Sequence, residues 1–256
     1  MARFRMWKRL SILVVVALLL SLYVVAVPAA ETVAAETVIF SEDFEGGLPG
    51  DWYVYTAKGW GWLPGSGDAR DGCAGTYMIA DSYHNQTIDF QSIMYTPSFD
   101  CSSYGKVILE FDHDYSAMAG CYPYKADVEV YVGGSPTMVW RCQAGNPVSG
   151  HITVDISHVA AGQSDVKIRW WYFATAWNIF WQWEVDNVKV SAPPPDLVVE
   201  KEAQCYPDGT FIVGYTVTND GGTAAGNSTT CKYLGGVLQE TQPCPPLGPG
   251  QLCRGV

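Results

Sequence analysis

Residues 107–115 read Val-Ile-Leu-Glu-Phe-Asp-His-Asp-Tyr, and from Leu109 onward apolar and polar side chains alternate. A period of two is typical of a β-strand with one buried face. The pattern recurs at 126–132, 152–156 and 166–170. The only helix expected is a short one around 157–161. Many short strands joined by turns, such as the Gly133-Gly134 pair, favour an all-β fold, a jelly-roll β-sandwich of two antiparallel sheets.

Three consecutive prolines at 193–195 separate two parts of the chain. Proline cannot continue a helix or a central strand, so these residues are interpreted as a linker. The first domain is expected at 36–192 and the second at 196–256. Strands are expected in the second at 196–200, 211–219 and 228–233. They predict a partial immunoglobulin-like β-sandwich, because a complete one takes about 100 residues. An unfinished sheet leaves an open edge that invites pairing with another chain.

The first 30 residues have the features of a signal peptide. Four basic residues precede the apolar run Leu10–Val27, which ends at Pro28-Ala29-Ala30. Small residues there suit a signal peptidase, so we expect export to the cell surface or the extracellular space. The run is near the lower limit for a membrane span, so an uncleaved N-terminal anchor stays open as the only membrane contact.

Composition excludes several classes of function. The formal net charge is −11, and 48% of residues are hydrophobic against 16% charged, which is far from a disordered chain. Nucleic acid is a poor partner, because a phosphate backbone is bound by clustered Lys and Arg. No phosphate-cradling glycine loop occurs, so no nucleotide partner is expected.

Covalent modifications typical of exported chains are expected. Four cysteines lie on each side of the linker: Cys73, Cys101, Cys121 and Cys142, then Cys205, Cys231, Cys244 and Cys253. Even numbers in each half predict disulfides, with three possible pairings per half that the sequence does not distinguish. No Cys-x-x-Cys occurs, which makes zinc a weak alternative. Asn85 and Asn227 begin Asn-x-Ser/Thr glycosylation sequons.

Acidic residues at the two ends of the first domain predict a cation site. Apolar side chains of the first strand share one parity: Val38, Phe40 and Phe44. Asp43 and Glu45 therefore point to the opposite face. Near the C-terminal end of the first domain, the alternation of apolar and polar residues shifts by one position around Asp186, which indicates a bulge. First and last strands commonly pair in such sandwiches, so the three carboxylates are expected to meet and to bind structural calcium. The alternative is that Asp43 and Glu45 are solvated edge charges.

Four motifs resemble those of choice-of-anchor J modules, relatives of MAM and cleaved-adhesin jelly rolls. They are Phe40-Ser-Glu-Asp-Phe-Glu-Gly-Gly-Leu-Pro-Gly-Asp-Trp52, Tyr95-Thr-Pro-Ser-Phe-Asp100, Leu109-Glu-Phe-Asp-His113 and Trp183-Glu-Val-Asp-Asn-Val188. The resemblance covers nearly all of the first domain and implies an extracellular binding module. It also implies calcium at Asp43, Glu45 and Asp186. The cysteines and the Trp-rich stretch around Trp177 are not part of the family pattern.

The second domain resembles a CARDB repeat, a cell-adhesion-related immunoglobulin-like module. The matching segments are 195–199, 215–226 and 247–251. The closing strands of that family are absent, which puts independent folding of this part in doubt.

Aromatic residues form a second candidate site. Ten lie in two regions: Trp60, Trp62, Trp170, Trp171, Tyr172, Phe173, Trp177, Phe180, Trp181 and Trp183. These are more aromatic side chains than one face of one sheet can hold, so some are expected to be exposed. Sugars stack on exposed aromatic rings. Trp170 and Trp183 fit inward phases and are expected in the core. Trp60 and Trp62, between glycines, and Trp177, in a Thr-Ala-Trp-Asn loop, are predicted to face a ligand.

Catalytic motifs are weak. Alternation in Asp112-His113-Asp114 places His113 on the face opposite to both acids, so the three do not converge. Neither Gly-x-Ser-x-Gly nor His-Glu-x-x-His occurs. We therefore expect a protein without enzymatic activity, an adhesion or recognition protein that binds glycans or surface proteins through a calcium-stabilised jelly roll. The alternatives are a glycan hydrolase on the same scaffold, whose paired carboxylates have no fixed spacing, and a structural spacer of the cell envelope.

Overall fold

The structure is a computed structural model. It describes residues 22–28, 35–55, 61–64, 73, 75–81, 90–116, 125–142, 149–174, 182–208 and 210–255. Contacts between Cα atoms divide the chain into two units. Unit 1 comprises residues 1–35 and 194–256, and unit 2 comprises 36–193, so the chain divides within the three prolines. Within the described ranges, no helix is both long and apolar enough to cross a membrane.

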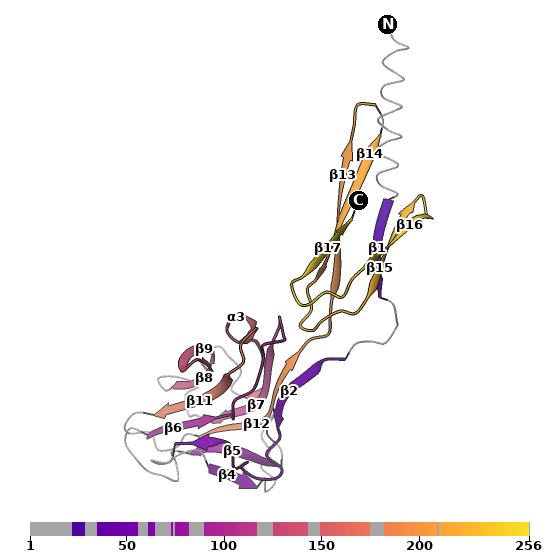
Figure 1. Ribbon diagram of the computed structural model, residues 1–256. Coiled ribbons are helices and arrows are strands. Elements are labelled where there is room, and N and C mark those ends of the chain that lie inside the picture. The colour runs from indigo at the N-terminus through magenta and orange to yellow at the C-terminus, as the bar shows by residue number, and fades with distance from the viewer. Residues whose placement is uncertain are drawn as a thin grey trace. The chain divides into compact units, whose positions relative to one another are not determined.

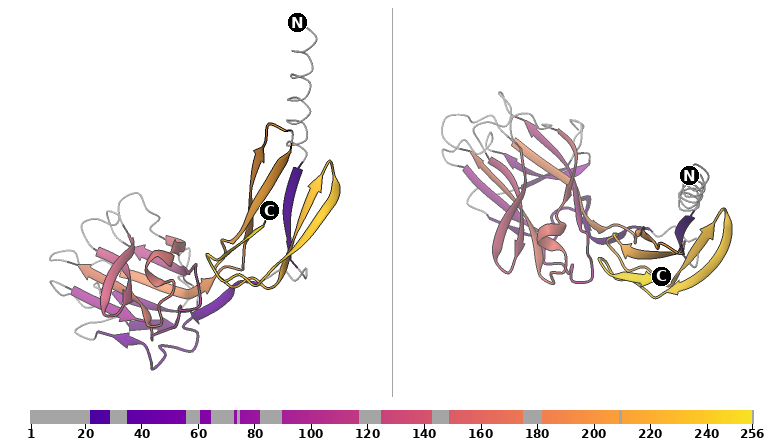
Figure 2. Two further views of the ribbon diagram at one scale, coloured as in Figure 1. Left: turned by 45° about the horizontal axis from the view of Figure 1, so that its top comes forward. Right: turned by 90° about the horizontal axis from the view of Figure 1, so that it is seen from above.

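Unit 2 contains two antiparallel sheets that lie as two layers (Figures 1 and 2). The first, the β12 sheet, contains β2 (Thr37–Glu42), β4 (Gly61–Pro64), β5 (Thr76–Asp81), β7 (Ile108–Ser116), β10 (Ser149–Asp155) and β12 (Gln182–Ala192). Its order is β10-β7-β12-β5-β4, with β2 also paired to β12. The second, the β11 sheet, contains β3 (Tyr53–Val54), β6 (Phe90–Tyr95), β8 (Lys125–Val132), β9 (Ser135–Arg141) and β11 (Val166–Ala174). Its order is β3-β6-β11-β8-β9.

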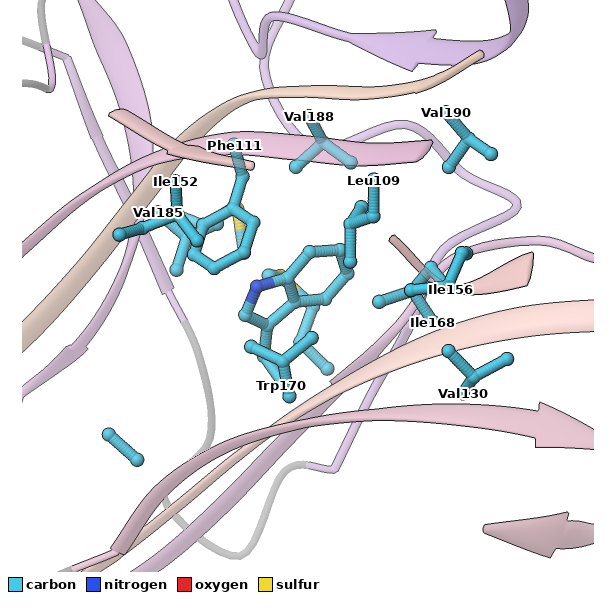
Figure 3. Packing of buried hydrophobic residues seen from close by; sticks show 14 of the residues in the cluster. Leu109, Phe111, Val130, Ile152, Ile156, Ile168, Trp170, Val185, Val188 and Val190 are labelled. Atoms are coloured by element: carbon cyan, nitrogen blue, oxygen red, sulfur yellow. The ribbon is translucent and has the colours of Figure 1, made fainter. Parts of the chain in front are cut away.

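The core of unit 2 lies between these sheets and is built around Trp170 of β11. Figure 3 shows this ring beside Leu109 and Phe111 of β7, and all three side chains are fully buried. Trp52 stacks on Trp170 at 5.9 Å between ring centroids. Burying large apolar side chains from both sheets stabilises the unit by about 1.5–3 kcal/mol for each side chain. Trp183 is also fully buried, as its phase predicted.

The alternating segments form the strands that the sequence predicted, so the all-β fold class is confirmed. The short helix α3 (Ser157–Ala160) occupies the expected position. Gly133 and Gly134 join β8 to β9 with φ values of 59° and 83°, a conformation that glycine adopts without steric cost. One detail differs: β2 slips by one residue against β12 between Val190 and Ser191, which leaves Val38 51% exposed and off the parity of Phe44.

Unit 1 contains two three-stranded antiparallel sheets (Figure 1). One is β1 (Leu22–Pro28), β15 (Ser228–Leu234) and β16 (Val237–Cys244), and the other is β13 (Leu197–Cys205), β14 (Phe211–Asn219) and β17 (Leu252–Gly255). The buried apolar cluster is small: Tyr215, Val217, Cys244 and Leu247. A disulfide between Cys244 and Cys253 joins β16 to β17. β1 lies within the segment predicted as a signal peptide and pairs with β15 along its whole length.

Asn219 organises the turn after β14. Its side chain is fully buried, and its Oδ1 accepts hydrogen bonds from the backbone N–H groups of Asp196 (3.1 Å) and Gly221 (3.0 Å). Its Nδ2 donates to the carbonyls of Thr223 (2.8 Å) and Leu247 (2.9 Å). All four hydrogen-bonding positions of the amide are therefore used, as a buried polar group requires.

Candidate functional site

The structure does not test the three tryptophans predicted to face a ligand. Trp60 and Trp177 lie outside the described residues. Trp62 belongs to β4, of which the structure describes the backbone. These three residues stay a prediction from the sequence.

The predicted pairing of first and last strands is present. β2 pairs with β12, with Glu42 opposite Val188. The bulge predicted near Asp186 is also present, because the register between β12 and β7 shifts between Asp186 and Lys189, and Asn187 has a φ of 48°. Asp186 is 1% exposed.

The three predicted calcium ligands each accept a backbone hydrogen bond. Asp43 Oδ1 accepts from the N–H of Glu45 (3.2 Å), and Glu45 Oε1 accepts from the N–H of Thr76 (2.9 Å). Asp186 Oδ1 accepts from the N–H of Asn187 (2.8 Å). Carboxylate oxygens are typical calcium ligands. In the described part of the chain, however, no group of three or more His, Cys, Asp or Glu side chains is arranged to hold a metal. Calcium therefore stays a prediction.

A ladder of acidic side chains crosses β7 and β12, and sequence reasoning missed it. Asp112 lies opposite Asp186, and Asp114 lies opposite Glu184. Asp114, Glu184 and Asp186 are each at most 4% exposed. Burial raises the pKa of the nearby Cys73 thiol, and the negative charges of all four carboxylates raise it further. Acidic residues occur at alternate positions in both β7 and β12, but the sequence does not show that the two sets lie opposite each other.

Half of the cysteines predicted to form disulfides are free thiols. Cys73 and Cys101 are buried, Cys205 is exposed and Cys231 is half-buried. Cys244 and Cys253 are bonded to each other, and Cys142 is disulfide-bonded. Cys121 lies outside the described residues. Of the two sequon asparagines, Asn227 is exposed, as glycosylation requires, and Asn85 is outside the described residues.

The outward face of the β11 sheet carries a hollow of about 650 Å³. We call it the tyrosine hollow. Its walls include three aromatic and three charged side chains: Tyr53, Tyr95, Tyr131, Asp51, Asp165 and Lys167. Its volume is within the range of small-molecule binding sites. Its base is the sheet itself, because Tyr53 lies opposite Tyr95 on β6, and Tyr131 lies opposite Lys167 on β11.

The three rings form a continuous aromatic surface. Tyr53 and Tyr95 have ring centroids 5.9 Å apart, and Tyr95 meets Tyr131 edge-on at 5.3 Å. Tyr53 is 59% exposed, so much of its side chain faces solvent. Burial raises the pKa of Tyr131 to about 12, and its hydrogen bond with Tyr95 contributes to this rise. The Tyr131 hydroxyl therefore stays protonated at neutral pH.

Arg169 packs against these rings. Its guanidinium carbon lies 4.7 Å from the ring centroid of Tyr131, 5.0 Å from that of Trp171 and 5.8 Å from that of Tyr95. It forms an ion pair with Glu129, and Nη1 donates to the Tyr95 hydroxyl at 3.2 Å. Attraction between a cation and aromatic faces holds the rings in place. Ser98 Oγ donates to Asp165 Oδ1, which fixes one carboxylate of the hollow.

Comparisons with known proteins identify no family. No protein-family model matches the chain, and no curated protein is similar to it in sequence. Similar solved structures include the K1 and K3 cleaved adhesin domains of Lys-gingipain from Porphyromonas gingivalis W83. They are 17% and 12% identical, with TM-scores of 0.40 and 0.43, and cover 59% and 60% of this chain and 96% and 99% of theirs.

The K2 cleaved adhesin domain of Lys-gingipain is similar at 14% identity and a TM-score of 0.39, covering 59% of this chain and 96% of its own. Among the motif families named above, cleaved adhesin is the one represented in these similarities. Membership of the choice-of-anchor J and CARDB families stays a prediction. Similarity at this level assigns no function to the chain.

Proposed function

We propose that the chain is an extracellular recognition protein that binds a glycan in the tyrosine hollow of unit 2. The observation that carries this proposal is the group of three tyrosine rings held side by side on a sheet, with charged side chains at their rim. Sugar rings present C–H groups on their faces and hydroxyls on their edges. An aromatic surface with polar groups around it is complementary to both.

Several features support recognition without chemical turnover. The ring positions are set by cross-strand pairs and by Arg169, so binding would cost little ordering of side chains.

The predicted leader and the disulfide between Cys244 and Cys253 support an extracellular location, because disulfides persist in oxidising compartments. A neighbouring surface protein stays the alternative ligand, because tyrosine is also enriched in protein interfaces.

Binding can be tested with a glycan array probed by the full chain. Tyr53→Ala and Tyr131→Ala should abolish the signals that the natural chain gives. Tyr55→Ala is the matched control, because Tyr55 is also exposed but does not line the hollow. Signals that survive both hollow variants would place the ligand elsewhere and contradict the proposal.

The glycan hydrolase alternative is tested by the same ligands. Glycans that bind are incubated with the chain, and released sugars are measured by chromatography. We expect none above the level of an Asp51→Asn, Asp165→Asn double variant. Release that depends on these carboxylates would establish the hydrolase. The spacer alternative predicts no array signal at all.

A further inference from the structure

We propose that the tyrosine hollow selects an uncharged sugar and reads two adjacent hydroxyls of it with Lys167 and the carboxylates of Asp51 and Asp165. This inference rests on the proposed function and specifies its ligand class. It depends on which hydrogen-bonding roles and charges the hollow leaves open, as set out below.

The polar side chains of the hollow offer complementary roles. Asp51 and Asp165 accept hydrogen bonds only, and Lys167 donates only. Lys167 is exposed, and among the described residues no carboxylate forms an ion pair with it. Asp51 is exposed as well, and only Asp165 has a described partner, the Ser98 hydroxyl. Lys167 and Asp51 are therefore available to a ligand.

Adjacent sugar hydroxyls satisfy both roles at once. Each hydroxyl donates one hydrogen bond and accepts others, so one can donate to a carboxylate while its neighbour accepts from an ammonium group. Hydrogen bonds with one charged partner are about twice as strong as neutral ones. A ligand with a single type of group, such as a phosphate or an amine, would leave either the carboxylates or the lysine unmatched.

Cations are disfavoured by what already lies against the rings. The Arg169 guanidinium occupies a face of Tyr131 at 4.7 Å and lies 5.8 Å from the centroid of Tyr95. This face of Tyr131 is therefore already covered by a cation, and Lys167 stands at the rim. An amino sugar or a lysine side chain would gain no cation–aromatic contact there and would lie close to the Lys167 ammonium group.

Anions are disfavoured by the two carboxylates. Asp51 and Asp165 outnumber Lys167 at the rim, while the charge of Arg169 is paired with Glu129. The chain as a whole has a net charge of −11. A uronic acid or a sialic acid would meet repulsion both at long range and in the hollow. A neutral sugar avoids both penalties.

Calorimetric titration of the full chain with trisaccharides of equal length tests the inference. The probes are neutral trimers of glucose, mannose, galactose and xylose, the anionic trimer of galacturonic acid and the cationic trimer of glucosamine. We expect a neutral trimer to bind at least about tenfold more tightly than both charged ones. Lys167→Met should weaken the neutral trimer about tenfold or more, and Lys167→Arg should retain most of the affinity because it keeps a donor.

Lys106→Met is the matched control, because Lys106 is an exposed lysine of unit 2 that does not line the hollow. Tighter binding of the galacturonic acid or glucosamine trimer, lost in Tyr131→Ala, would overturn the uncharged-sugar inference and leave the proposed function standing. Unchanged affinity in Lys167→Met would overturn the role of Lys167. Absence of binding by every trimer, or binding that survives Tyr53→Ala and Tyr131→Ala, would overturn the proposed function itself.

Discussion

The guanidinium carbon of Arg169 lies 4.7 Å from the ring centroid of Tyr131, and the same guanidinium is paired with Glu129. The charged side chains of the pair are 12% and 10% exposed. One group thus balances a nearly buried carboxylate and orders the rings of the tyrosine hollow. The stability of unit 2 and the geometry of the tyrosine hollow therefore depend on the same side chain.

Arg169→Met should destabilise unit 2 by about 3 kcal/mol, because it leaves the Glu129 carboxylate without its partner. The Arg169→Met, Glu129→Gln double variant should recover much of this loss, since the buried charge is removed as well. Ligand affinity should stay low in both variants, because the rings are no longer held. Chemical denaturation and calorimetric titration measure the two effects separately. Equal stability of the single and double variants would contradict this assignment.

His151 should make unit 2 more stable in mild acid than in alkali. Its Nδ1 lies 2.7 Å from Asp112 Oδ1 and its Nε2 lies 3.3 Å from Glu110 Oε1. The hydrogen bond with Asp112 raises the pKa of His151, and Glu110 raises it further. The stabilisation is complete below the unfolded-state pKa of about 6.5 and is lost as pH rises through the higher folded-state pKa.

Melting temperatures between pH 5 and pH 9, about two units either side of neutrality, measure this effect. His151→Gln should reduce the decline of the melting temperature with rising pH, whereas substitution of the exposed His158, His158→Gln, should leave this decline unchanged. An identical decline in the His151 variant would exclude the histidine as its source.

His113 should act in the opposite direction. It is fully buried, neither ring nitrogen has a hydrogen-bond partner among the described residues, and its ring meets Trp140 edge-on at 5.0 Å. Burial lowers its pKa to about 4. Its folded-state pKa is below its unfolded value, so stability falls as pH decreases from about 6.5 toward 4, by about 3 kcal/mol.

His113→Phe should remove this acid sensitivity while keeping an aromatic ring in the core. Denaturation with urea at pH 6.5 and pH 4, roughly the unfolded and folded pKa values, gives the difference. The prediction fails if the variant and the natural chain lose the same stability over this interval.

The fold could be predicted from sequence because its strands alternate strongly. The segments ending at Tyr115 and Val132 specify their strand identity and place Leu109, Phe111 and Tyr115 on the inward face. The parity of Val38 could not be predicted, because the register slip opposite Val190 and Ser191 depends on pairing and not on local pattern.

The tyrosine hollow was harder to predict from the sequence, because it is formed by residues of neighbouring strands. Tyr95, Tyr131 and Arg169 come from three strands, and each is an ordinary outward residue on its own. The sequence drew attention to clustered tryptophans, whereas two of the most conspicuous, Trp170 and Trp183, are fully buried. Cross-strand register, which the sequence does not give, turns isolated tyrosines into one surface.

The predicted calcium site can be tested directly. Calcium that binds only the native state through Asp43, Glu45 and Asp186 would stabilise unit 2, by about 2.7 kcal/mol at one hundred times its Kd. Tryptophan fluorescence follows this unit, because every tryptophan after residue 30 precedes the three prolines. The midpoint of the unfolding transition of unit 2 should fall when a chelator is added. Asp186→Asn should abolish the difference, and Asp208→Asn in unit 1 is the control. A midpoint insensitive to chelation would leave the carboxylates as surface and buried charges without an ion.

Gly221 should be intolerant of any side chain. A Cβ there would lie 2.2 Å from the carbonyl oxygen of Pro194 and 2.5 Å from the backbone nitrogen of Asp196. Both are backbone atoms, and the segment is held by Asp220, whose N–H donates to the Asp196 carbonyl at 2.7 Å. Gly221→Ala must therefore displace the segment and weaken the hydrogen bonds of Asn219, at a cost of about 1–3 kcal/mol.

Gly226→Ala is the matched control, because nothing lies within 4 Å of its added Cβ. Differential scanning calorimetry of the full chain should show a lower transition temperature for unit 1 in the Gly221 variant alone. The unit 2 transition, followed by tryptophan fluorescence, should be unchanged in both. Because the apolar cluster of unit 1 has four fully or nearly buried members among the described residues, a loss of this size removes a large part of its stability. A Gly221 variant that melts like the natural chain would show that the turn yields without strain.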